Sequence, residues 1–177
     1  MDLPEKKYEI AEDGHVESIS VFERGESHKM IEQFMLIANE MVSEEIDKLD
    51  YPSIYRIHET PDPEKMNNFL QILKNFDLEI PEPPKEFGPK YYQQLLEVFR
   101  DHPQKKILSF LLLRSLKQAV YSANNAQHFG LASPSYTHFT SPIRRYPDLA
   151  IHRILRRSGF LKNKKAPYSQ TELEQLS

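Results

Sequence analysis

Apolar and polar side chains alternate near the start of the chain, first in residues 8–10 and again in residues 16–21. Such alternation is typical of half-buried β-strands. Asp13 and Gly14 lie between the two segments, and glycine tolerates the positive φ that tight hairpin turns require. The pattern predicts a β-hairpin over residues 7–22. An isolated hairpin is marginally stable, so we expect further strands beside it.

Residues 27–49 change to the three-to-four-residue spacing of a helix with one buried stripe, and Ser27 can cap its start. The stripe predicted to be buried consists of Ile31, Phe34, Met35, Ala38, Met41, Val42 and Ile46. Glu32, Asn39 and Ser43 share a polar stripe beside it. A solvent-exposed face is the simpler interpretation of the polar stripe. The alternative is that Glu32 positions a water, a ribose hydroxyl or an arginine.

Prolines and loops divide the middle of the chain into shorter elements. Residues 55–59 are predicted to be extended, and Pro63 can begin the next helix. Helices are also predicted over residues 90–99 and 105–121. The second of these is apolar on most sides, which predicts that it is the most buried element.

The last third begins with residues 129–139, which are predicted to be irregular to extended. A helix is predicted from residue 146 or 147 to residue 158, where Gly159 stops it. A further helix start is predicted at Ser169 or Thr171. Together these elements predict an α+β fold that is mainly helical, with extended segments that join a sheet supplied mostly by residues outside this chain.

The composition is that of a globular domain. The chain has 177 residues, enough for one domain with a core, and 39% of them are hydrophobic. No cysteine is present, which excludes disulfides and thiolate zinc sites. The N-terminal residues lack the apolar region of a signal peptide, and the longest apolar runs are too short to cross a bilayer. We therefore expect a cytoplasmic protein without a membrane partner.

Charge is distributed unevenly along the chain. The net charge of −3 by itself disfavours a nucleic-acid-binding protein, yet residues 141–165 contain a single acid, Asp148. The basic residues of this stretch are Arg144, Arg145, Arg153, Arg156, Arg157, Lys162, Lys164 and Lys165. The asymmetry predicts an end of the molecule that faces a polyanion, and a solvated basic helix face is an equally good interpretation.

Residues 138–149 combine helix-start signals with two arginines. Thr140 or Ser141 can accept hydrogen bonds from backbone N–H groups where a helix begins. Arg144 and Arg145 lie beside that start, where free N–H groups and the positive end of the helix dipole favour phosphate. The segment therefore predicts a phosphate clamp.

Asp148 supports a second interpretation of the same segment. It suits the first turn of a helix and can hold an arginine in place, in which case the arginines pair with structural carboxylates. Aromatic residues leave a similar choice, because they can stack on bases or fill a core. The aromatic residues in question are Tyr91, Tyr92, Tyr121, Phe129, Tyr136 and Phe139.

Several sequence blocks, in this order, resemble the ribonuclease R/ribonuclease II family of 3′→5′ exoribonucleases, and they extend over nearly the whole chain. The blocks are Asp-Leu-Pro-Glu at 2–5, Ser-His-Lys-Met-Ile-Glu-Gln-Phe-Met-Leu-Ile-Ala-Asn at 27–39, Tyr-Arg-Ile-His-Glu at 55–59, Leu-Arg-Ser-Leu-Lys-Gln-Ala-Val-Tyr at 113–121, and His-Phe-Gly-Leu-Ala at 128–132, followed by Tyr136 and residues 138–149. Arg-Arg-Tyr-Pro-Asp-Leu at 144–149 is most similar to the ribonuclease R branch.

The resemblance implies a hydrolytic enzyme that threads single-stranded RNA 3′ end first and releases nucleoside 5′-monophosphates. It implies Mg²⁺ held by aspartates upstream of the Asp-Leu-Pro-Glu block, and flanking cold-shock-like and S1 RNA-binding domains. Residues 1–177 would then be the C-terminal portion of a mixed sheet-and-helix catalytic domain. Within this portion we distinguish a hairpin (7–22), a helical body (27–121), and an RNA-facing motif with the last helix (128–160).

The family motif also implies roles for single residues. Arg144 is the candidate catalytic residue that grips phosphate near the scissile bond, and Arg145 binds RNA or braces the fold. Tyr136 and Ser141 are further candidates for RNA binding. The family's Glu-Glu pair corresponds here to Glu32 and Gln33. If the first position carries the family's role, Glu32 is a second catalytic candidate; if the second does, this chain departs from the family. No metal ligand is expected within the chain.

These assignments lead to one main hypothesis and two alternatives. The main hypothesis is an exoribonuclease portion that, by itself, binds Mg²⁺ poorly and does not degrade RNA. The first alternative is a free-standing RNA-binding or regulatory module without catalysis. The second is a purely structural helical domain, which predicts no salt-dependent binding to RNA.

Overall fold

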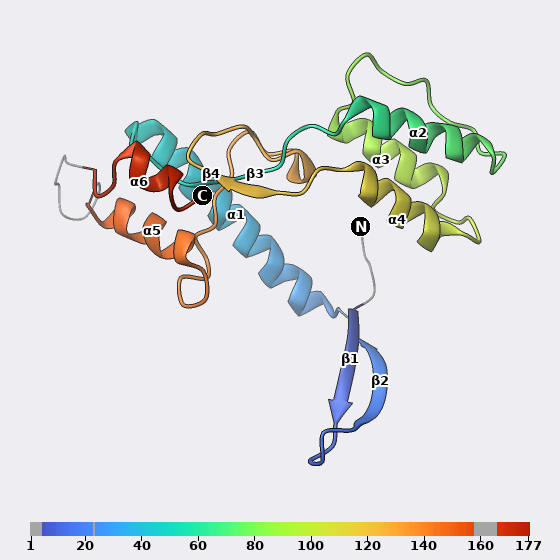
Figure 1. Ribbon diagram of the computed structural model, residues 1–177, viewed down its shortest axis with the longest axis horizontal. Helices are drawn as coiled ribbons and strands as arrows, with labels where there is room; N and C mark the ends of the chain where they lie inside the picture. The colour runs from blue at the N-terminus through green and yellow to red at the C-terminus, as the bar shows by residue number, and fades with distance from the viewer. Residues whose placement is uncertain (1–4, 23, 158–165) are drawn as a thin grey trace. The chain divides into compact units, whose positions relative to one another are not determined.

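The computed structural model describes residues 5–22, 24–157 and 166–177. The elements it describes are β1 (Glu5–Ile10), β2 (Val16–Phe22), α1 (Glu26–Leu49), β3 (Tyr55–Ile57), α2 (Pro63–Lys74), α3 (Pro89–Val98), α4 (Lys105–Ser115), β4 (Val120–Ser122), the 3₁₀ turn η1 (Phe129–Leu131), α5 (Tyr146–Leu155) and α6 (Gln170–Glu174) (Figure 1). This mixture of helices and two-stranded sheets confirms the α+β, mainly helical prediction. The chain forms two compact units, residues 1–36 and 37–177.

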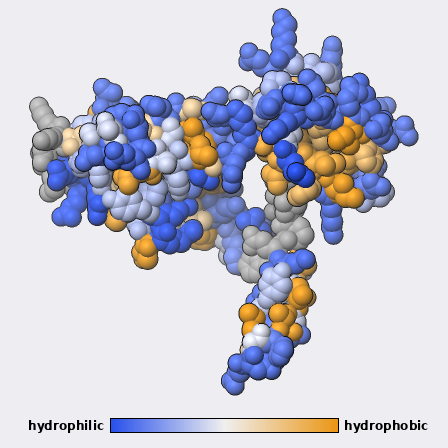
Figure 2. Space-filling view, viewed as in Figure 1, coloured by the Kyte–Doolittle hydropathy of each residue, from blue (hydrophilic) through white to orange (hydrophobic). Residues whose placement is uncertain are grey.

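The predicted hairpin is present in the first unit. β1 pairs antiparallel with β2, so that Tyr8 lies opposite Ile19, and Gly14 occupies the turn with a φ of +87°. The apolar side chains of the hairpin are exposed, as Figure 2 shows. They are Tyr8, Ile10, Val16, Ile19 and Val21. The described residues therefore leave the hairpin without a buried apolar face.

The long helix α1 is confirmed, but the prediction of which stripe is buried was wrong. Phe34 is 59% exposed and Met41 is 65% exposed, whereas the polar Asn39 and Ser43 are buried. Of the predicted apolar stripe, Ile46 is fully buried. Helical spacing identifies side chains that share a face, but the neighbouring segments decide which face is covered. Here hydrogen-bonding groups of residues 135–140 cover Asn39 and Ser43.

The main core of the second unit lies between α2, α3 and α4. Met66 and Leu73 from α2, Leu95 from α3 and Leu108 from α4 are fully buried there, and Phe129 of η1 joins the same cluster. Their positions follow the helical spacing of apolar residues. This cluster fixes the segment that begins at His128 against the helices.

α4 differs from its prediction in length and in burial. It ends at Ser115, because Leu116 has an extended backbone with ψ of 150° and residues Val120–Ser122 form β4 instead. β4 pairs antiparallel with β3, with Tyr121 opposite Arg56. The helix is also not the most buried element, since Ile107 is 56% exposed and Phe110 is 52% exposed. Apolar residues alone could not distinguish helix from strand here; cross-strand pairing decided it.

Two smaller clusters position the C-terminal helices. Ile46 of α1 packs with Ile151 and Ile154 of α5, which joins α5 to the end of α1. Leu173 of α6 is buried in the other cluster. The predicted helix start near residue 169 is confirmed by a capping box between Ser169 and Glu172.

The predicted end of α5 at residues 158–160 lies outside the described residues. Within the described parts of the chain, no helix is long and apolar enough to cross a membrane.

Candidate nucleic-acid interface

The loop that leads into α5 is tightly turned. The backbone N–H groups of Arg144 and Arg145 donate to the carbonyl oxygen of Ser141 over 3.3 and 3.1 Å. Helix α5 starts at Tyr146, so its N-cap is Arg145, which has no side-chain capping bond. The prediction that Thr140 or Ser141 caps this helix was therefore wrong, because the turn places both residues before the cap.

A buried carboxylate braces this turn. Asp148 is fully buried in the first turn of α5. Its Oδ1 accepts from Nη2 of Arg145 and from the backbone N–H of Ser141, both over 2.8 Å. A buried charge needs a partner and hydrogen bonds of this kind, and the helix N-terminus also favours a carboxylate. The prediction that Asp148 holds an arginine is confirmed, and the arginine it holds is Arg145.

Arg144 has a different environment from its neighbour. Its side chain is exposed, and its Nη2 lies 3.5 Å from Oγ of Ser141. Among the described residues, no carboxylate lies within ion-pair distance of Arg144. Ile143, directly before it, is fully exposed. The loop thus presents Arg144 to solvent, while the side chain of Arg145 is paired with Asp148.

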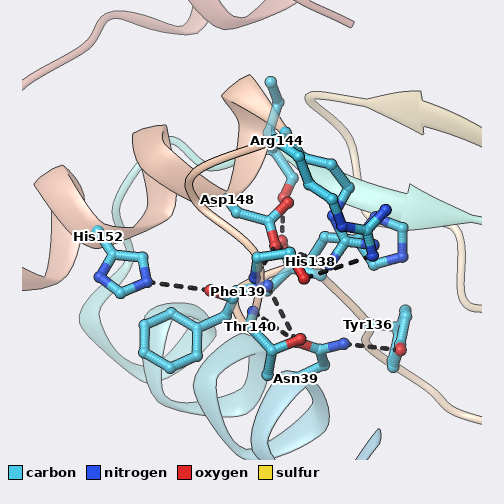
Figure 3. Close-up of polar contacts among 12 residues, drawn as sticks. Asn39, Tyr136, His138, Phe139, Thr140, Arg144, Asp148 and His152 are labelled. Carbon is cyan, nitrogen blue, oxygen red and sulfur yellow. Dashed lines mark hydrogen bonds and ion pairs between the residues drawn. The ribbon is translucent and has the colours of Figure 1, made fainter. Parts of the chain in front are cut away.

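Asn39 of α1 holds the start of the same loop (Figure 3). Its Oδ1 accepts from the backbone N–H groups of Phe139 and Thr140 over 2.9 and 3.3 Å, and its Nδ2 donates to the Tyr136 hydroxyl over 2.9 Å. His152 of α5 donates from Nε2 to the Phe139 carbonyl over 3.0 Å. Side chains of two helices therefore fix the backbone before Arg144.

Tyr136 does not offer its ring for stacking on a base. The residue is only 4% exposed, and its ring lies edge-on to His128 and His138 at centroid distances of 5.3 and 5.8 Å. The interpretation of Tyr136 as an RNA-stacking residue is therefore replaced by a supporting role behind the loop. Ser141 is half-buried and contacts Arg144 through its hydroxyl.

Histidine rings form an electrically neutral support around Tyr136. Burial is the main cause that lowers the pKa of His128 to about 4, with His58 acting in the same direction. Burial also lowers the pKa of His138 to about 4, and Arg145 adds to this effect. The hydroxyl of Tyr121 is hydrogen-bonded to Nδ1 of His138 over 2.8 Å. These rings are neutral near pH 7, so the positive charge of the site comes from arginine.

Little in the sequence indicates this ring cluster. His58, His128 and His138 lie far apart along the chain and match no metal-binding spacing. The signal that was available is the pair of family blocks that contain His128 and His138. Those blocks suggested importance, but the contacts between the rings depend on the tertiary structure.

Glu32 lies in the first unit, on α1. Its carboxylate is 3.4 Å from Nη2 of Arg24, which makes an ion pair between half-exposed side chains. The catalytic assignment of Glu32 stays a prediction. The arrangement shown is that of a paired surface residue.

The described residues do not supply a magnesium site. Across residues 5–22, 24–157 and 166–177, no three His, Asp or Glu side chains are grouped so that they could hold a metal ion. Magnesium prefers carboxylate and water oxygens in octahedral geometry. The side chains at the Arg144 loop, with one carboxylate already bound to Arg145, do not fit this requirement.

Comparison with known proteins identifies the family. The model of the RNB domain matches residues 1–158. The chain belongs to the RNB-domain family. The chain is 42% identical to ribonuclease R of Aquifex aeolicus over 170 residues, which is 96% of this chain and 24% of that protein. It is 41% identical to ribonuclease R of Escherichia coli over 152 residues, covering 86% of this chain and 19% of that protein.

Solved structures agree with this assignment. Ribonuclease R of Mycoplasma genitalium in complex with ribose methylated single-stranded RNA matches 98% of this chain, with a TM-score of 0.89 and 30% identity. The match covers 27% of that structure's chain. The same protein in complex with double-stranded RNA matches with the same TM-score. This RNB-domain chain thus spans about a quarter of the length of these relatives.

Proposed function

We propose that this RNB-domain chain is part of a hydrolytic 3′→5′ exoribonuclease that degrades single-stranded RNA to nucleoside 5′-monophosphates. The observation that carries the proposal is Arg144, an exposed guanidinium without a carboxylate partner among the described residues, on a loop braced from both sides. A guanidinium in this state can donate two parallel hydrogen bonds to a phosphate. The similarity to ribonuclease R supports RNA as the source of that phosphate.

In this proposal the two arginines do different work. Arg144 binds an RNA phosphate and stabilises the negative charge that develops during hydrolysis of the phosphodiester bond. Arg145 keeps the loop in place through Asp148, so its role in RNA binding is indirect. Ser141 orients the Arg144 side chain through its hydroxyl.

The proposal assigns the metal chemistry to other residues of the complete enzyme. Magnesium would activate the attacking water and would be held by a cluster of aspartates. The described residues contain no such cluster, and we propose that the 177-residue chain by itself binds RNA without degrading it. The cytoplasm is its proposed location.

Binding of a fluorescent single-stranded RNA at two salt concentrations tests the role of Arg144. Arg144→Ala should weaken binding by about tenfold at low salt and reduce the salt dependence, because roughly one phosphate contact is lost. Arg100→Ala is the matched control, since it removes the same charge from an exposed arginine that is already paired with Glu97. Equal affinities for Arg144→Ala and the unchanged chain would contradict the proposal.

A further inference from the structure

Two residues of the polar stripe of α1, Asn39 and Ser43, form a buried, hydrogen-bonded seam with the segment that precedes the Arg144 loop. Asn39 is 3% exposed and binds Tyr136, Phe139 and Thr140. One turn further along the helix, Ser43 is fully buried, and its hydroxyl is hydrogen-bonded to that of Ser135 over 2.7 Å. Buried polar side chains are found where their hydrogen bonds are satisfied, and here every partner lies in residues 135–140.

Asn39 differs from Ser43 because its bonds reach the backbone. Two consecutive N–H groups, those of Phe139 and Thr140, converge on a single oxygen of its amide. This arrangement restricts the direction of the chain as it enters the loop. Ser43, in contrast, contacts the side chain of Ser135, which lies before Phe139 and makes no bond to the loop backbone through Ser43.

The next residue of the loop is held from the other side. The N–H of Ser141 donates to Asp148 over 2.8 Å, so three successive backbone N–H groups end on side-chain oxygens. Asn39 of α1 supplies one oxygen and Asp148 of α5 supplies the other. The residues that follow turn back on Ser141 and present Arg144 to solvent.

We propose that Asn39 is a positioning residue for Arg144. It acts through the backbone of Phe139 and Thr140 and sets where the Arg144 guanidinium meets a phosphate. The inference rests on the proposed function, in which Arg144 binds RNA. Misplacement of a binding group by about 1 Å is enough to lose much of its effect, which gives a remote amide influence over affinity.

Two substitutions at residue 39 separate the amide oxygen from the volume of the side chain. Asn39→Leu has nearly the same shape and removes the acceptor, so Phe139 and Thr140 lose their partner. Asn39→Asp keeps an oxygen for both N–H groups and can accept a hydrogen bond from the Tyr136 hydroxyl. Ser43→Ala is the matched control, because it removes a buried hydrogen bond from the same face of α1 without touching the loop backbone.

The experiment is a double-mutant cycle on the affinity for single-stranded RNA. Asn39→Leu should weaken binding by about tenfold, and adding it to Arg144→Ala should cause no further loss, because both changes act through one guanidinium. Asn39→Asp should bind within about threefold of the unchanged chain, and Ser43→Ala should bind equally well. Thermal unfolding of each variant shows which of them remain folded at the assay temperature.

Amide hydrogen exchange supplies a readout that does not depend on RNA. In Asn39→Leu the amides of Phe139 and Thr140 should exchange faster, and that of Ser141, bound to Asp148, should change less. If Asn39→Leu fails to fold, Asn39→Ala, which removes the same acceptor, is carried through the same cycle with the same expected outcome.

The outcomes distinguish this inference from the proposed function. Additive losses for Asn39→Leu and Arg144→Ala, or unchanged exchange at residues 139 and 140, overturn the positioning role alone. If Arg144→Ala itself leaves RNA affinity unchanged, the proposed function fails and the positioning role fails with it. Non-additive losses with rescue by Asn39→Asp establish the inference.

Discussion

At the residue scale, adjacent arginines of one motif have different surroundings, and we therefore propose different roles for them. Arg145 has a buried carboxylate 2.8 Å away, whereas the partner of Arg144 among the described residues is a serine hydroxyl at 3.5 Å. Of the interpretations left open by the sequence, pairing with a structural carboxylate applies to Arg145, and the phosphate clamp stays a prediction for Arg144. The paired arginine is Arg145, and Arg144 is available for a phosphate.

The buried histidines give the fold a dependence on pH. The ordinary pKa of histidine is 6.5, and in the folded chain that of His128 and that of His138 are lowered to about 4. Below pH 6.5 the unfolded chain therefore binds more protons than the folded chain. The free energy of unfolding should be largest above pH 6.5 and should fall as the pH drops towards 4.

Urea unfolding between pH 7 and pH 5 measures this effect, because most carboxylates titrate below that window. Replacing both rings, by His128→Asn and His138→Asn, should flatten the pH dependence. Asparagine can keep the hydrogen bonds that the Nδ1 atoms make with Leu131 and Tyr121, and it does not titrate. A double variant with the same pH slope as the unchanged chain would contradict this explanation.

At the scale of elements, α1 shows how an amphipathic helix can bury its polar side. Its apolar residues Phe34 and Met41 are exposed, while Asn39 and Ser43 are covered by residues 135–140. Large apolar side chains that are exposed together on one helix are typical of a face that binds other protein surface. In the described residues, the stability of α1 comes from its hydrogen-bonded seam and from Ile46 near its end.

The same substitution, methionine to alanine, at a buried position and at an exposed position tests which helix faces are covered. Met66→Ala in α2 removes a fully buried side chain and should lower the free energy of unfolding by about 2–5 kcal/mol. Met41→Ala in α1 removes a side chain that is 65% exposed and should change it by less than about 0.5 kcal/mol. Chemical denaturation of both variants provides the comparison. A large loss for Met41→Ala would mean that its face of α1 is covered in solution.

At the scale of the whole molecule, this RNB-domain chain covers about a quarter of the ribonuclease R proteins it resembles. Its described residues contain an exposed arginine on a braced loop and no cluster of carboxylates for a metal. Both the exoribonuclease portion and a non-catalytic RNA-binding module would show salt-dependent binding. A purely structural domain would show none.

Incubation of the pure chain with single-stranded RNA and Mg²⁺ tests the predicted division of labour. We expect RNA binding that weakens with salt and no release of nucleoside monophosphates, measured by chromatography of the products. Addition of EDTA should leave the binding unchanged. Metal-dependent release of mononucleotides by the chain alone would show that it contains a complete active site.

Local sequence determined the parts of this protein that depend on short-range chemistry. The Asp13-Gly14 turn, the span of α1 and the capping box at Ser169 follow from backbone preferences and spacing, and the structure confirms them. These features depend on neighbours a few residues apart, so the sequence carries the information needed to predict them.

Tertiary structure alone decided which surfaces are covered and which of the two arginines pairs with Asp148. Asn39 is 100 residues from Phe139 in the sequence, and its role depends on how α1 and the loop before α5 pack together. The same packing buried Tyr136 and reversed the faces of α1, while strand pairing shortened α4. Hydrogen bonds and packing between distant segments set these outcomes, and periodicity within one segment does not specify its partner.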